Sequence, residues 1–278
     1  MRIRESQRAM GNLVTMDDLS NDDIVSILDD AERLVPVAKG DILLPLLQGK
    51  VLANMFFENS TRTRMSFETA MKRLGGSVLN FSSVGTSVSK GETLYDTMQM
   101  IDGYADIAAI RHPRQGAAQY SADAVEIPIL NAGDGAGNHP TQTMLDLFTI
   151  RQSHGKLDGL NVVLVGDLRY GRTVHSLSHA LVRFGASLTL VSPSSLKMPA
   201  EIVSDLKSHG ADVTETESLD GQISEADVIY MTRIQKERFP DEEEYAKVAG
   251  IYRIEAANLV GAKTVSYTHL TLPTICSV

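Results

Sequence analysis

Hydroxyl and guanidinium groups are concentrated in one short stretch, Ser60-Thr61-Arg62-Thr63-Arg64, directly after an apolar segment at 51–57. The apolar segment predicts a buried strand, and the helical spacing of apolar residues beyond Arg64 predicts a helix that starts near Ser60. Backbone N–H groups and the dipole at a helix start favour a bound anion, and arginine pairs strongly with phosphate. The stretch therefore predicts a cradle for a phosphate group, although a capped helix with solvated arginines fits the same pattern.

Two further predicted strands end in polar groups. The segment 106–110 predicts a buried strand that leads to Arg111, and 125–131 predicts another, followed by a glycine-rich turn and a helix start at His139-Pro140-Thr141-Gln142. Proline fits the first helical turn. Because ligands of open α/β sheets bind at the carboxyl ends of strands, Arg111 is expected on the same rim as Arg62. A histidine at a helix start is often only a cap.

A new strand–turn–helix series begins near Leu160. It predicts a strand at 160–165, a turn rich in glycine at 166–173 and a helix to about Phe184. The turn nearly satisfies the P-loop pattern, with Arg172 in place of the lysine, and its context also resembles a dinucleotide fold. However, no convincing magnesium-binding aspartate follows a later strand, the Gly-x-Gly-x-x-Gly spacing is missing, and Ser-Pro follows Val191 where an acidic residue is needed. Both nucleotide-binding interpretations thus fail a specific test.

Four segments resemble the aspartate/ornithine carbamoyltransferase family. FENSTRTR at 57–64 is similar to the carbamoyl-phosphate motif of that family, and HPTQ at 139–142 is similar to its second signature. GDLRYGRTVHSL at 166–177 and TRIQKER at 232–238 are similar to the aspartate branch, and the Ser-Met-Gly arrangement of ornithine enzymes is not found. The resemblance implies transfer of the carbamoyl group of carbamoyl phosphate to L-aspartate in pyrimidine synthesis. An enzyme for another amine such as ornithine, or a truncated non-catalytic homologue, stays an alternative.

The resemblance also implies residue roles. Phosphate is expected to contact Ser60, Thr61, Arg62, Thr63 and Arg111, helped by Ser87 and Lys90 from a neighbouring subunit. The expected catalytic residues are Arg62, Thr63, Arg111 and His139, of which the last three polarise the carbonyl oxygen, while Gln142 holds the carbamoyl nitrogen. The resemblance also implies that Lys90, Arg172, Arg233 and Gln235 bind aspartate. Arg172 and Arg233 suit its two carboxylates, because arginine binds a carboxylate through two parallel hydrogen bonds. No metal or cofactor is expected. A homotrimer with shared active sites, and a regulatory chain as a further partner, are implied.

The alternating pattern predicts an α/β fold of two lobes, each a mainly parallel sheet flanked by helices, joined by an interdomain helix. We expect a carbamoyl-phosphate domain at 1–148, an incomplete aspartate domain at 149–265, and a tail at 266–278 that departs from the family pattern. The tail, SYTHLTLPTICSV, resembles unrelated sequence appended to a truncated gene.

Composition limits the kinds of partner and the compartment expected for this protein. The 278 residues carry a net charge of −9, which argues against nucleic acid or an anionic membrane as partner. The single cysteine, Cys276, excludes an internal disulfide. The first residues lack a signal-peptide core and no apolar run reaches the length of a membrane span, so a cytoplasmic protein is expected.

Overall fold

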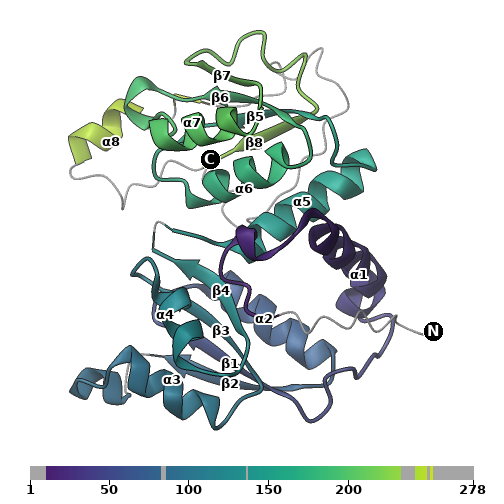
Figure 1. The fold of residues 1–278 in the computed structure, drawn as a ribbon, viewed down its shortest axis with the longest axis vertical. Coiled ribbons are helices and arrows are strands. Elements are labelled where there is room, and N and C mark those ends of the chain that lie inside the picture. The colour runs from purple at the N-terminus through teal and green to yellow at the C-terminus, as the bar shows by residue number, and fades with distance from the viewer. Residues whose placement is uncertain (1–10, 83–85, 136, 233–241, 249–250, 253–278) are drawn as a thin grey trace. The chain divides into compact units, whose positions relative to one another are not determined.

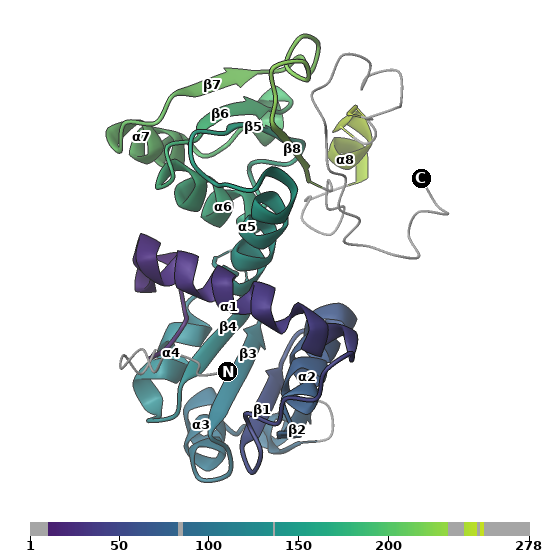
Figure 2. The same ribbon diagram turned by 90° about the vertical axis from the view of Figure 1, so that its right-hand side faces the viewer.

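The computed structural model describes residues 11–82, 86–135, 137–232, 242–248 and 251–252 (Figures 1 and 2). The chain divides into two compact units, residues 1–144 and 145–278, and each contains a sheet of four parallel strands. The predicted α/β class with parallel sheets is therefore confirmed. Within the described ranges, every helix lacks the length or the apolar character to cross a lipid bilayer.

The first unit follows a strand–helix alternation from residue 51 onward. Its elements in chain order are η1 (Met16–Asp18), α1 (Asn21–Lys39), β1 (Val51–Phe56), α2 (Thr61–Arg73), β2 (Ser77–Ser82), η2 (Ser87–Lys90), α3 (Leu94–Asp102), β3 (Ile107–His112), α4 (Ala117–Ala124) and β4 (Ile129–Asp134). The strand order is β2-β1-β3-β4, and every neighbouring pair is parallel. The carboxyl ends of β1, β3 and β4 therefore lie at one edge of the sheet.

Both faces of this sheet are covered, because successive strand residues point to opposite sides. Ala53 and Met55 of β1 pack in one cluster with Met98 of α3, whereas Leu52 of β1 packs in another with Met71 of α2. Helices α3 and α4 thus cover one face and α2 the other (Figure 2). Two buried faces explain the nearly continuous apolar runs of these strands.

The predicted end of the strand before His139 is wrong. We expected the strand at 125–131 and a turn from Ala132, whereas β4 runs from Ile129 to Asp134. Ala132 and Gly133 are small enough for the buried edge, and the N–H of Gly133 donates to Asn131 Oδ1 at 2.8 Å. A register shift against β3 between Ile110 and His112 accommodates the extra residues. Tertiary pairing thus extends the strand into a segment that reads locally as a turn.

The second unit repeats the alternation. Helix α5 (Pro140–His154) begins in the first unit and ends in the second. It is followed by β5 (Asn161–Val165), α6 (Arg172–Val182), β6 (Ser187–Val191), η3 (Ser194–Leu196), α7 (Ala200–Ser208), β7 (Val213–Thr216), β8 (Val228–Met231) and α8 (Glu242–Val248). The strand order is β7-β6-β5-β8, again all parallel. Helices α6 and α7 pack side by side on one face of this sheet (Figures 1 and 2).

Candidate active site

The predicted phosphate cradle lies where β1 ends and α2 begins. Ser60 is the N-cap of α2, but its hydroxyl accepts no hydrogen bond from the helix, unlike the N-caps Ser20 and Thr93. The backbone explains the difference, because ψ is 106° at Ser60 and 168° and 161° at the other two. The first-turn N–H groups of α2 are thus left without a side-chain cap, which keeps them available to an anion.

The side chains of this turn face solvent to different degrees. Thr61 and Arg62 are exposed, whereas Ser60 and Thr63 are partly buried. A buried residue that sequence reasoning missed, Asn54, holds the turn in place. Its Nδ2 donates to the carbonyl of Arg64 at 3.0 Å and to Asn80 Oδ1 of β2 at 3.1 Å. An asparagine in an otherwise apolar strand was the available signal, since a buried amide needs partners.

Arg111 lies at the carboxyl end of β3, directly beside the end of β1. It pairs in register with Phe56, and its carbonyl accepts from the N–H of Phe57 at 2.9 Å. Its guanidinium donates to Glu58 Oε1 at 3.0 Å and to the carbonyl of Ala132 at 3.3 Å. The side chain is only 13% exposed, and its buried Nε has no hydrogen-bond partner in the part of the chain that the structure describes. A buried donor without a partner is costly, which makes this atom a candidate for contact with a ligand.

His139 and Gln142 follow the next strand of the sheet. His139 is buried, and its Nδ1 lies 3.2 Å from Thr141 Oγ1. Its carbonyl accepts from the N–H of Gln142 at 2.9 Å, and Pro140 is the first residue of α5. Arg62, Arg111 and His139 therefore follow the carboxyl ends of the neighbouring strands β1, β3 and β4.

Asp134 fixes the loop that carries His139, and sequence reasoning did not single it out. Its buried carboxylate accepts from the N–H of Gly116 at 2.9 Å and of Asn138 at 2.7 Å. Its carbonyl accepts from Gly137 at 2.9 Å. A carboxylate that satisfies several backbone N–H groups makes a rigid loop end. The signal was a lone acidic residue among glycines just before a helix start.

Ser87 and Lys90 lie in η2, which follows the edge strand β2, and both are exposed. Their expected role in a neighbouring subunit stays a prediction.

In the second unit, the turn at 166–171 is built from close backbone contacts with Thr232. Gly166 has φ +113°, and a Cβ at this position would lie 2.6 Å from Thr232 Oγ1. The Thr232 hydroxyl accepts from the N–H of Asp167 at 2.7 Å, and Asp167 Oδ1 accepts from the N–H of Tyr170 at 2.9 Å. Arg172, the first residue of α6, is buried at 8% exposure.

This geometry argues against the nucleotide-binding interpretations of the turn. The N–H of Gly166 donates to Val191, that of Leu168 to Leu196, and those of Asp167 and Tyr170 to the groups just given. A phosphate-binding loop needs such N–H groups free to point at the ligand. At this turn they are used within the protein.

Two of the expected aspartate ligands, Arg233 and Gln235, lie outside the described residues. Arg172 is thus the only one of the expected aspartate-binding residues in the second unit whose position the described ranges include. The described residues also contain no group of three or more His, Cys, Asp or Glu side chains arranged to hold a metal ion.

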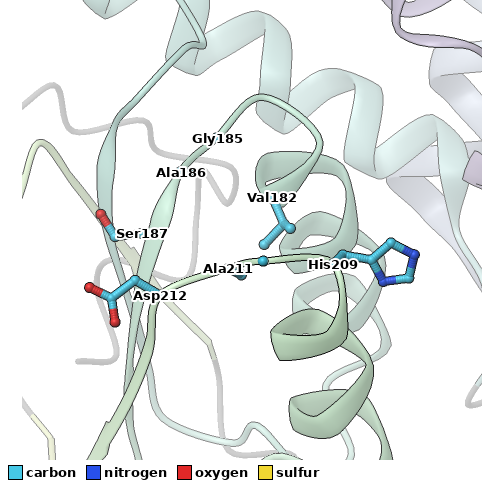
Figure 3. A pocket seen from close by; sticks show the side chains of 8 residues that line it. Val182, Gly185, Ala186, Ser187, His209, Ala211 and Asp212 are labelled. Atoms are coloured by element: carbon cyan, nitrogen blue, oxygen red, sulfur yellow. The ribbon is translucent and has the colours of Figure 1, made fainter.

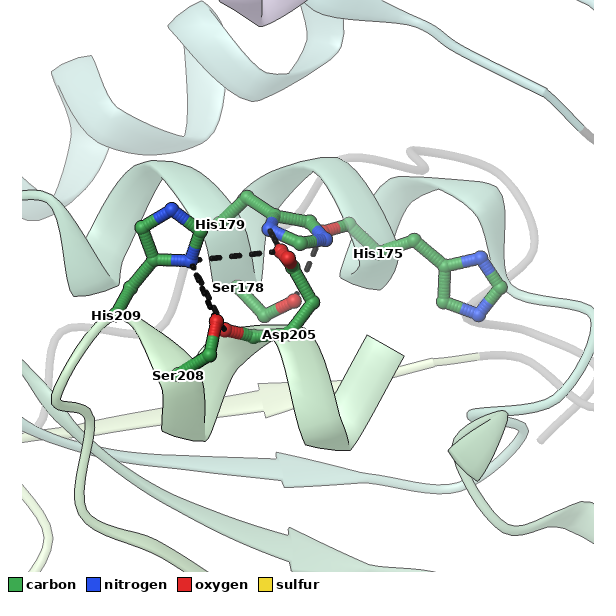
Figure 4. A network of polar contacts seen from close by, with 6 residues as sticks. All are labelled: His175, Ser178, His179, Asp205, Ser208 and His209. Carbon is green, nitrogen blue, oxygen red and sulfur yellow. Dashed lines mark hydrogen bonds and ion pairs between the residues drawn. The ribbon is translucent and has the colours of Figure 1, made fainter. Parts of the chain in front are cut away.

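Two other polar features of the second unit lie apart from these residues. A cavity of 240 Å³ between the α6–β6 and α7–β7 turns is lined by residues such as Ser187, His209 and Asp212 (Figure 3). It lies at the amino ends of β6 and β7, the edge opposite to that at which parallel sheets bind ligands. Next to it, Asp205 of α7 lies 3.3 Å from His179 Nδ1 and 3.6 Å from His209 Nδ1 (Figure 4). The contact with His179 links α6 to α7, whereas that with His209 lies at the end of α7 itself.

The fold and the strand-end residues define a class of two-unit α/β proteins in which cationic and polar side chains gather at the carboxyl edge of the first sheet. The family model for the aspartate/ornithine carbamoyltransferase carbamoyl-P binding domain matches residues 11–152, and that for the Asp/Orn binding domain matches residues 158–269. The chain belongs to the aspartate/ornithine carbamoyltransferase family.

Individual relatives lie in the aspartate branch. The aspartate carbamoyltransferase catalytic subunit of Methanothermobacter thermautotrophicus is 53% identical over 249 residues, which is 89% of this chain and 80% of the relative. The solved catalytic subunit of M. jannaschii aspartate transcarbamoylase matches with a TM-score of 0.84 and 49% identity, over 91% of this chain and 83% of that one. Trypanosoma cruzi aspartate transcarbamoylase in complex with N-(phosphonacetyl)-L-aspartic acid matches with a TM-score of 0.85 and 41% identity, over 92% of this chain and 82% of that one.

Proposed function

We propose that this protein transfers the carbamoyl group of carbamoyl phosphate to the amine of L-aspartate, giving N-carbamoyl-L-aspartate and phosphate, a step of pyrimidine biosynthesis. The relatives named above support the reaction, since their names give this activity. The observation that carries it in this chain is the buried, unpartnered Nε of Arg111 beside the uncapped start of α2.

In the reaction, the amine nitrogen of aspartate forms a bond to the carbamoyl carbon. The bond from this carbon to the bridging phosphate oxygen breaks, and its electron pair leaves with inorganic phosphate, which also supplies an acceptor for the amine proton. Negative charge develops on the carbonyl oxygen. Fixed donors aimed at this oxygen lower the barrier, because they need no reorganisation during the step.

The proposed roles of the residues follow the family resemblance. Ser60, Thr61, Arg62 and Thr63 bind phosphate at the start of α2, helped by Arg111. Thr63, Arg111 and His139 donate to the carbonyl oxygen, and Gln142 holds the carbamoyl nitrogen. Arg172 binds a carboxylate of aspartate, and the same role is proposed for Arg233 and Gln235. Glu58 already occupies one Nη of Arg111, so phosphate has to share or displace this contact.

We further propose a homotrimer in which Ser87 and Lys90 complete the site of a neighbour, with a regulatory chain as a further partner. Exposed apolar side chains in the connection between α1 and β1 support burial by a second copy: Ile42 is 51% exposed, Leu43 86% and Leu46 50%. Such surface is unfavourable in water unless a partner covers it.

The test of function is formation of carbamoyl-aspartate by the purified chain, measured beside calorimetric binding of carbamoyl phosphate. Turnover with aspartate but not ornithine supports the proposal. Turnover with ornithine alone identifies an enzyme for another amine, and binding without turnover identifies a non-catalytic homologue.

Shared sites have their own test. Arg62→Ala and Lys90→Ala proteins, each inactive alone, should regain activity after dissociation and mixing, because some hybrid interfaces then combine an intact cradle with an intact Lys90. A mixture that stays inactive, while wild-type subunits survive the same treatment, refutes the shared site.

A further inference from the structure

One polar cluster of the second unit consists of residues to which the proposed reaction assigns no role. Tyr230 of β8 donates its hydroxyl to Asp146 Oδ2 of α5 at 3.0 Å, and its side chain also forms a hydrogen bond with that of Thr173 in α6. Three elements that are far apart in the sequence thus meet at one phenol oxygen.

Burying these polar groups costs more free energy than apolar side chains of the same size would. Asp146 is only 5% exposed, and burying a carboxylate costs free energy unless hydrogen bonds compensate it. Burial and the nearby Asp146 carboxylate raise the pKa of Tyr230, so the phenol keeps its proton and donates it. A phenylalanine would fill nearly the same space without the polar groups. The hydroxyl therefore does something other than fill volume.

The position of Thr173 shows what the cluster holds. Thr173 directly follows Arg172 in the first turn of α6, and the N-cap of that helix, Gly171, supplies no side-chain cap. The other end of the same turn is held by Thr232, whose hydroxyl accepts from the N–H of Asp167. Because Tyr230 and Thr232 are two residues apart, they lie on the same side of an extended chain. The end of β8 thus holds the turn at 166–173 at both of its ends, through Thr232 at Asp167 and through Tyr230 at Thr173.

The neighbouring residues of β8 serve a different cluster. Ile229 packs with Val163, Val165 and Val191 in a separate apolar cluster, and Met231 is 40% exposed. Within β8, Tyr230 is the residue for which a hydrogen bond to α5 or α6 is described.

We propose that Tyr230, held by Asp146, is a positioning residue for the amino-acid half of the site: it fixes the first turn of α6 so that Arg172 meets a carboxylate of the second substrate. This inference rests on the proposed function. It predicts that loss of the hydroxyl weakens recognition of aspartate but not of carbamoyl phosphate, whose ligands belong to the first unit.

The test compares Tyr230→Phe with Tyr252→Phe. Tyr252 is a matched control, because it lies in the same unit and its hydroxyl donates to the carbonyl of Glu217, just after β7, at 2.9 Å. Tyr230→Phe should raise the KM for aspartate about tenfold, the loss expected for one buried hydrogen bond, with kcat changed less than about threefold. Tyr252→Phe should leave both constants within about twofold of wild type.

Variants of Asp146 separate positioning from general stability. Asp146→Asn keeps an oxygen that accepts from Tyr230, so its KM for aspartate should stay nearer to wild type than that of Asp146→Ala. In the Asp146→Ala background, Tyr230→Phe should raise the KM for aspartate by less than about a further twofold, because the two residues act as one unit. Unfolding temperatures are recorded for all variants, since a merely structural role would lower them without changing the KM for aspartate alone.

Binding of succinate, a dicarboxylate without the amine, in the presence of carbamoyl phosphate gives a readout that needs no turnover. Tyr230→Phe should weaken succinate binding and leave the Kd of carbamoyl phosphate unchanged. If wild type binds succinate and Tyr230→Phe binds it equally well, or if both ligands weaken equally, this inference fails while the proposed function stands. If wild type neither turns over nor binds succinate, the proposed function fails and the inference fails with it.

Discussion

Replacement of Arg111 by alanine should abolish the binding of carbamoyl phosphate while leaving the protein folded. The guanidinium contacts the protein through Glu58 and the carbonyl of Ala132 and retains one unpartnered donor, Nε. The backbone pairing of β3 with β1 and β4 does not involve the side chain. Folding and binding therefore depend on different parts of this residue.

The effect on stability should be small. Glu58 is 35% exposed, so its carboxylate regains water after the arginine is removed. An exposed or partly exposed ion pair contributes about 1 kcal/mol or less, and the hydrogen bond to Ala132 contributes about 1 kcal/mol. We therefore expect the free energy of unfolding to fall by about 2 kcal/mol at most.

The effect on binding should be larger. Hydrogen bonds to a charged group contribute about 1.5 to 3 kcal/mol each. Loss of two of them, one from Nε and one from the Nη that phosphate has to share with Glu58, corresponds to a loss of at least about 100-fold in affinity. Calorimetry with carbamoyl phosphate measures this loss directly, and inorganic phosphate serves as a stable second ligand. Arg73→Ala is the matched control, because Arg73 is an exposed cation in the last turn of α2, at the end opposite to the cradle.

The control separates local contacts from general electrostatics. Both variants lower the net charge by one unit, so a long-range effect would weaken binding in both. Arg73→Ala should bind within about twofold of wild type. A folded Arg111→Ala protein that binds carbamoyl phosphate within about threefold of wild type would refute the assignment of Arg111 to the ligand.

Three further predictions test other parts of the structure. Gly166→Ala should lower the free energy of unfolding by roughly 2 to 4 kcal/mol, since its Cβ would meet Thr232 and φ is +113°. Gly185→Ala, at φ +70° in open space, should lower it by about 1 kcal/mol. Urea titrations compare the two variants, and equal losses would contradict the close approach of Gly166 to Thr232. Burial lowers the pKa of His175, whose Nε2 lies 2.8 Å from the carbonyl of Leu168, so the neutral form stabilises the fold above the ordinary pKa of 6.5 and that contribution is lost as the pH falls toward the lower folded pKa. His175→Gln should make urea midpoints less dependent on acid pH, and an unchanged dependence would exclude this group. Arg62→Ala should abolish binding of carbamoyl phosphate, whereas Arg233→Ala should raise the KM for aspartate with the first substrate still bound; equal loss of both affinities in a folded Arg233 variant would refute that division.

Local sequence signals are strong where a helix begins with a side-chain cap. Ser20 and Asp23 form a capping box at the start of α1, and Thr93 caps α3 through the N–H of Asp96. The signals failed where packing decides. Helix α4 was not predicted, because it begins after Gly116 without a side-chain cap. Its buried residues are mostly alanines, which pack against α3 and β4. Strand β4 continues through Gly133 for the same kind of reason, since its pairing with β3 overrides the local turn preference.

The candidate ligands at the strand ends could be predicted from the sequence, but the residues that hold them in place could not. Arg62 and Arg111 were expected on one rim from the predicted strands and from the rule that ligands of open α/β sheets bind at the carboxyl ends of strands. Asn54, Asp134 and Thr232 were missed, because each acts through a hydrogen bond to a residue that sequence spacing does not bring near, or through a backbone group that carries no sequence signal.

By itself, the sequence determined which chemistry is available: hydroxyls and arginines at a helix start, further cations at later strand ends, and the apolar periodicity that makes parallel sheets. Only the tertiary structure decided which of these groups meet. The strand order places β1 beside β3, so that Glu58 reaches Arg111 across 53 residues, and it brings Tyr230 to Asp146 across 84. The physical reason is that propensities act within a few residues, whereas such contacts are set when whole faces of sheets and helices are buried together.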